Sequence, residues 1–73
     1  MTEYGIVLFH TTSSAMRAEK LLVKAGYPVK LIPTPRQFSS DCGIALRFDW
    51  SRHEQVKSVL DLSHVEIDAI HRL

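Results

Sequence analysis

Two strand–helix–strand patterns follow one another along the chain, and this order constrains the fold more than any other feature. Residues 4–10 are apolar and rich in β-branched and aromatic side chains, which is typical of a strand. Residues 13–25 carry alanine and leucine at helical spacing, and a short strand at 29–32 follows between two prolines. The second pattern has its strands at 43–49 and 65–70, with a helix between them.

Capping and turn residues set the ends of the two predicted helices. The run Thr11–Ser14 is rich in side chains that favour the N-cap, and Gly26 suits the position just after a helix C-terminus. Ser51 and Glu54 fit a capping box, in which each side chain bonds the backbone N–H of the other residue. We therefore expect a first helix from about Ser13 to Ala25 and a second helix that begins after Ser51.

The order β-α-β-β-α-β is the ferredoxin-like pattern. It predicts an α+β fold, with a four-stranded antiparallel sheet of strand order 4-1-3-2 and two helices on one face. The other face is expected to be open or used for self-association. A length of 73 residues accommodates one such domain, over residues 1–73.

Composition and motifs exclude several classes of function. Nine basic residues balance eight acidic ones, which argues against a nucleic-acid partner. No apolar run is long enough to span a membrane, and the N-terminus lacks a signal peptide, so we expect a cytoplasmic protein. The chain has no glycine-rich phosphate loop, no HExxH motif and no recognisable Ser/His/Asp set. We therefore expect neither an enzyme nor a bound cofactor.

The predicted topology gives the one cysteine a defined place. Strand and helix directions bring three connections to the same end of the sheet, at residues 10–14, 33–42 and 62–64. In the order 4-1-3-2 the third strand lies beside the first. Cys42, at the beginning of the third strand, is therefore expected near the end of the first strand and the start of the first helix.

That position favours a reactive thiol. A helix N-terminus carries unpaired N–H groups and a partial positive charge, which stabilise a thiolate. Arg36 in the same loop and His10, if protonated, would add to this effect, whereas Asp41 would oppose it. Gly43 leaves the backbone after Cys42 bare, so that a sulfur adduct or a partner could approach. The polar loop around the cysteine predicts an accessible thiol.

Two alternatives remain open from the residues alone. Free cysteine is among the most buried residue types, so Cys42 can also be an inert thiol. The domain would then be a non-catalytic protein-binding or regulatory module that uses its open sheet face or a strand edge. The other alternative is a metal site of Cys42, His10 and His64, although no short-spacing motif links these three residues.

Two segments give the chain a family likeness. The most specific part is a Pro-x-Pro-Arg loop followed by Ser-x-Cys-Gly-hydrophobic-Ala-Leu, within residues 31–36 and 40–47. Further similar positions lie in the first half of the chain, at Phe9, Thr12, Ser13–Ala15 and Glu19–Lys20. On these residues the chain resembles the selenium/sulfur carrier-like proteins, a family of short prokaryotic domains, over nearly its whole length.

The resemblance implies a non-enzymatic carrier of sulfur or selenium. Its cysteine, Cys42, would hold a persulfide or perselenide and pass the terminal atom to an acceptor. The supporting residues implied are Arg36, Ser40, Asp41, Gly43, Thr12 and Ser13. The implied partners are a sulfur or selenium donor, such as a cysteine desulfurase, and an acceptor enzyme. The uncovered sheet face also makes a homodimer an expectation.

Overall fold

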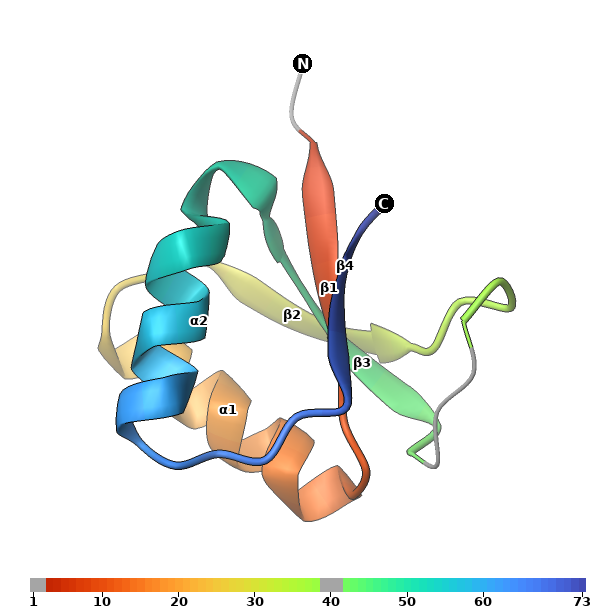
Figure 1. The fold of residues 1–73 in the computed structure, drawn as a ribbon, viewed down its shortest axis with the longest axis horizontal. Helices are drawn as coiled ribbons and strands as arrows, with labels where there is room; N and C mark the ends of the chain where they lie inside the picture. Colours follow the sequence, from red (N-terminus) through yellow and green to blue (C-terminus); the bar gives the residue numbers. More distant parts are fainter. Residues whose placement is uncertain (1–2, 39–41) are drawn as a thin grey trace.

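The computed structural model describes residues 3–38 and 42–73. These residues form four strands and two α-helices (Figure 1). Their order is β1 (Tyr4–Leu8), α1 (Thr12–Lys24), β2 (Val29–Pro33), β3 (Ile44–Asp49), α2 (His53–Leu62) and β4 (Ala69–Arg72), with a short 3₁₀ turn (Trp50–Arg52) before α2. No helix of this part of the chain is long and apolar enough to cross a membrane.

The strands form one antiparallel sheet of order β2-β3-β1-β4. This order is 4-1-3-2 read in reverse, so the predicted α+β topology is confirmed. Both helices lie on one side of the sheet (Figure 1). The strand β2 is an edge strand, as predicted. Pro28 and Pro33 have no backbone N–H, so they could not supply all the hydrogen bonds of a strand paired on both sides.

Side-chain and backbone caps fix the ends of α1. Thr11 is the N-cap, and its hydroxyl accepts a hydrogen bond of 3.1 Å from the Ser14 amide. At the other end Gly26 has a φ of 90°, in the left-handed region that glycine adopts without strain. The Tyr27 amide then donates to the Leu22 carbonyl, five residues earlier, at 2.9 Å, and this is the 6→1 hydrogen bond of a Schellman motif. The predicted helix is thus confirmed, shifted by one residue.

The predicted capping box at the second helix is wrong. Asp49 is the residue that caps, because its Oδ1 accepts from the Ser51 amide at 3.1 Å and from the Ser51 hydroxyl at 3.0 Å. This cap starts the 3₁₀ turn Trp50–Arg52, and α2 proper begins only at His53. Glu54 is exposed in the first turn of α2. The Ser51 hydroxyl therefore donates to Asp49 at the end of β3 and does not take part in a capping box with Glu54.

The last strand lies later in the sequence than predicted. Val65, predicted as its first residue, follows the C-terminus of α2, where its amide bonds the Leu60 carbonyl at 3.0 Å. Val65 is 8% exposed and belongs to the main core. It is apolar because it packs into the core just after α2, and not because it belongs to a strand. Pairing with β1 begins where the Asp68 amide meets the Leu8 carbonyl at 2.7 Å, and β4 runs from Ala69.

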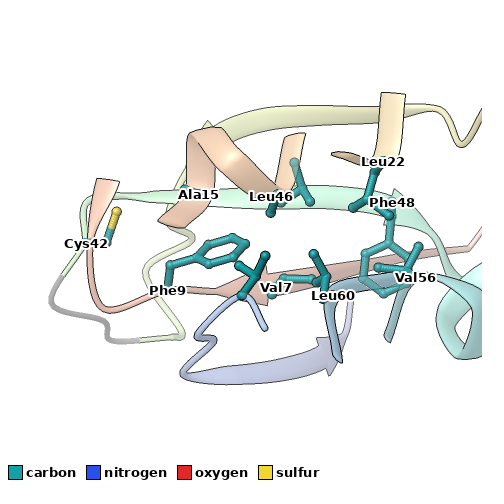
Figure 2. Packing of buried hydrophobic residues seen from close by; sticks show 11 residues of the cluster. Val7, Phe9, Ala15, Leu22, Cys42, Leu46, Phe48, Val56 and Leu60 are labelled. Carbon is teal, nitrogen blue, oxygen red and sulfur yellow. The ribbon is translucent and has the colours of Figure 1, made fainter. Parts of the chain in front are cut away.

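The main core lies between the sheet and the helices (Figure 2). Alternate residues of β3 point into it: Leu46 and Phe48 are buried, and Ile44 packs against the cluster. Its buried members are Val7, Phe9, Ala15, Ala18, Leu22, Cys42, Leu46, Phe48, Val56, Leu60 and Val65. Val56 and Leu60 are the buried residues of α2 in this cluster, and Val59 packs against it.

The outer sheet face is less open than predicted. Ile6 and Leu8 point to this face, yet they are 0% and 2% exposed. Phe38, from the connection between β2 and β3, packs against them, and its ring stacks on that of His71 with centroids 4.5 Å apart. The described part of that connection lies on the side of the sheet away from the helices (Figure 1). A loop aromatic thus covers apolar surface that the topology alone leaves bare.

Candidate functional site

Cys42 lies beside the first turn of α1, as the topology predicts. It lies two residues before β3, and its Sγ is 3.6 Å from Oγ1 of Thr12, the first residue of the helix. Two separate segments meet here because β1, which leads into α1, pairs with β3. The sulfur therefore has a hydroxyl and a helix N-terminus as its neighbours.

The expectation of an accessible thiol is wrong. Cys42 is 3% exposed and is a member of the main core cluster. Figure 2 shows it at one end of the row of core side chains, on the same side as Phe9 and Ala15. The physical reason is strand alternation: position 42 has the same parity as Ile44, so its side chain turns toward the helices. Extending the apolar pattern of β3 back by two residues would have revealed this burial.

Thr34 forms two hydrogen bonds to the backbone at Cys42 and Gly43. Its hydroxyl donates to the Cys42 carbonyl at 3.1 Å, and its amide donates to the Gly43 carbonyl at 3.1 Å. Thr34 is half-buried and directly follows β2. No motif in the sequence singles out Thr34. Its position, directly after a strand that ends opposite Ile44, is the signal that was available.

Three of the predicted supporting residues, Thr12, Ser13 and Gly43, are exposed. Gly43 has open space around it, since a Cβ there would meet no atom within 4 Å. Ser13 is exposed in the first turn of α1. That turn, all of it within the described residues, holds no acidic side chain, so nothing there offsets the positive end of the helix dipole. An anionic sulfur species would therefore be stabilised at this end of α1.

Arg36 does not contact the thiol in this structure. It is exposed in a turn closed by the hydrogen bond from the Phe38 amide to the Pro35 carbonyl, 3.0 Å long. Among the residues described, it forms no hydrogen bond or ion pair. Ser40 and Asp41 lie outside the described residues.

The three side chains of the metal alternative do not form a ligand set. His10 is exposed, with its Nε2 4.0 Å from Oδ1 of Asp68. His64 occupies the position after the α2 C-cap with a φ of 55°, where its amide bonds the Asp61 carbonyl at 3.1 Å. Across residues 3–38 and 42–73, no group of three or more His, Cys, Asp or Glu residues could hold a metal ion.

The chain also matches a known protein family. Residues 4–72 match the family model described as "Putative Se/S carrier protein-like". The chain belongs to this family. The match extends over nearly the whole chain, so the resemblance based on residues 31–36 and 40–47 is confirmed. No curated protein and no solved structure gives a significant match. The one cysteine of this Se/S carrier-like chain is Cys42.

Proposed function

We propose that this domain carries sulfur or selenium on Cys42, as a persulfide or perselenide, and delivers it to an acceptor protein. One observation carries the proposal: the single thiol of a Se/S carrier-like chain lies against the N-terminus of α1, with its Sγ 3.6 Å from Thr12 Oγ1. A helix N-terminus stabilises negative charge, and a terminal sulfur or selenium on Cys42 would be anionic.

The transfer needs no oxidant, reductant or second cysteine on this chain. The Cys42 thiolate attacks the terminal sulfur of a persulfide on the donor's cysteine. A new S–S bond forms on Cys42, the donor's S–S bond breaks, and the donor's cysteine leaves as a thiolate. A nucleophile of the acceptor then attacks the terminal sulfur on Cys42 and releases this chain as its thiolate. A cysteine desulfurase is a donor of the required chemistry.

Burial of the thiol means that local opening precedes transfer. Cys42 is 3% exposed, whereas Gly43 beside it is exposed and surrounded by open space. The sulfur lies at one end of the core cluster (Figure 2), so exposing it does not require the centre of the core to unfold. The partner would approach from the side of Gly43, where the backbone carries no side chain.

Intact-mass analysis tests the carrier function. The wild-type domain is incubated with a cysteine desulfurase and cysteine, and a gain of one sulfur atom is expected. Cys42→Ala should gain none, and Lys57→Met, which removes an exposed lysine of α2, should be loaded like the wild type. Absence of added sulfur on the wild type, or equal addition to Cys42→Ala, would contradict the proposal.

The burial of Cys42 favours a second function, a protein-binding module with an inert thiol. In that case Cys42 should be alkylated only when the whole domain unfolds, so its alkylation rate should be limited by the small population of the unfolded state. Cys42→Ser should then leave partner binding intact. A carrier instead requires alkylation much faster than global unfolding allows, which pulsed labelling together with urea unfolding measures.

A further inference from the structure

A shallow hollow lies at the end of β3 away from Cys42. Its volume is about 240 Å³, and its lining includes Tyr4, Lys30, Arg47 and Asp49. These residues come from β1, β2 and β3, so the hollow rests on three neighbouring strands. It is smaller than the roughly 300–1,000 Å³ of sites for drug-sized ligands, which limits the occupant to a small molecule or a single chemical group.

Two cations face each other across this hollow. Lys30 of β2 and Arg47 of β3 are directly opposite in the antiparallel pairing, so their side chains lie on the same face of the sheet. Like charges in this position destabilise a sheet. Within residues 3–38 and 42–73, neither side chain forms an ion pair or a hydrogen bond. The fold thus places two like charges side by side, neither of them in an ion pair with a described side chain, and Asp49 is the acidic residue of the same lining.

The guanidinium of Arg47 lies over an aromatic ring. Its Cζ lies 4.5 Å from the centre of the Tyr4 ring, and Arg47 is half-buried. Contact of a guanidinium with an aromatic face leaves its N–H groups available for two parallel hydrogen bonds to an oxyanion. The nearby carboxylate of Asp49 is already engaged by the amide and hydroxyl of Ser51, so it is not the partner of Arg47.

We infer that this hollow binds a doubly charged oxyanion of the phosphate class, held by Arg47 and Lys30 against Tyr4. The two cations supply charge for two negative charges, and the planar donors of Arg47 match phosphate geometry. The site lies at the opposite end of β3 from the thiol and does not depend on the carrier function. Either can therefore fail without the other.

Titration of the full chain with inorganic phosphate tests the site. Amide and Arg47 side-chain NMR signals around Lys30, Arg47 and Tyr4 should shift and saturate. Arg47→Met and Lys30→Met should each raise the half-saturating phosphate concentration by about tenfold, the loss expected for a charge-assisted hydrogen bond. Lys57→Met, which removes an exposed lysine of α2, should leave it unchanged.

Two comparison titrations make the inference falsifiable. Sodium chloride at matched ionic strength should not reproduce the shifts, because screening alone does not saturate at one site. Acetate, a monoanion, should bind more weakly than phosphate. Non-saturating shifts, equal effects of acetate and phosphate, or an unchanged response in Lys30→Met would overturn the inference. Lys30 is exposed, so its variant decides the outcome even if Arg47→Met does not fold.

Discussion

The hydroxyl of Thr12 and the sulfur of Cys42 lie 3.6 Å apart, although 30 positions separate the two residues in the sequence. Thr12 is exposed at the helix terminus, whereas Cys42 is buried beneath it. The contact therefore forms a boundary between solvent and the core at one end of the domain. Among the described residues, Thr12 and Gly43 are exposed neighbours of the sulfur, so we expect a group bound to it to emerge beside them.

Thr12→Val should slow the reaction of Cys42. The substitution keeps the branched shape and removes the hydroxyl that stabilises an anionic sulfur. Loss of a weak charge-assisted hydrogen bond predicts a decrease of roughly three- to tenfold in the alkylation rate and in sulfur loading. Ser13→Ala, the exposed neighbour, is the matched control and should behave like the wild type. Equal rates in the two variants would remove Thr12 from the site.

Thr34→Val should loosen the segment that carries the thiol. It removes the 3.1 Å hydrogen bond to the Cys42 carbonyl and preserves the side-chain volume. We expect a loss of about 1 kcal/mol of stability in urea unfolding, with faster alkylation of Cys42. Thr34→Ser retains the hydroxyl and should restore both values to near those of the wild type. If Thr34→Ser behaved like Thr34→Val, the hydrogen bond would not be the cause.

Gly5→Ala should destabilise the fold, whereas Gly43→Ala should not. A Cβ on Gly5 would lie 2.5 Å from Cε3 of Trp50 and 2.6 Å from Cζ of Phe48, so both rings would have to shift. Overpacking of this kind costs about 1–3 kcal/mol. A Cβ on Gly43 meets no atom within 4 Å, and its effect should stay within about 0.5 kcal/mol. Thermal unfolding of the two variants checks the contrast, and equal melting temperatures would contradict it.

His64→Gly should stabilise the domain. His64 has a φ of 55° at the C-terminus of α2, a conformation that costs a residue with a Cβ more than it costs glycine. We expect a gain of about 0.5–1 kcal/mol in the free energy of unfolding. His64→Ala keeps the Cβ and should bring no such gain, which separates backbone strain from loss of the imidazole. A gain of the same size in His64→Ala would contradict this explanation.

The fold could be predicted from the sequence because its signals are local and repeated. The helical spacing of Ala15, Ala18 and Leu22 and the alternation in β3 each reflect burial on one side of an element. The errors occur at element ends. Asp49 competes with Glu54 for Ser51, and Val65 belongs to a helix terminus that imitates the start of a strand. Periodicity does not distinguish such competing local bonds.

The candidate site could be predicted only in its position. Strand order alone brings Cys42 to Thr12, since β1 and β3 are neighbours. The burial of the sulfur depends on which face of the sheet residue 42 occupies. The polar residues before Cys42 instead favoured an exposed thiol. The role of Thr34 depends on a bond between residues eight positions apart, on either side of a loop, which no local pattern encodes.

Phe38 and Cys42 lie on opposite faces of the sheet, with only three residues between them. Phe38 packs on the cluster of Ile6, Leu8 and Ala45, whereas Cys42 belongs to the main core beneath the helices. Two residues close together in the sequence thus add apolar contacts to different layers of the domain, so substitution of one should weaken one layer and leave the packing of the other intact.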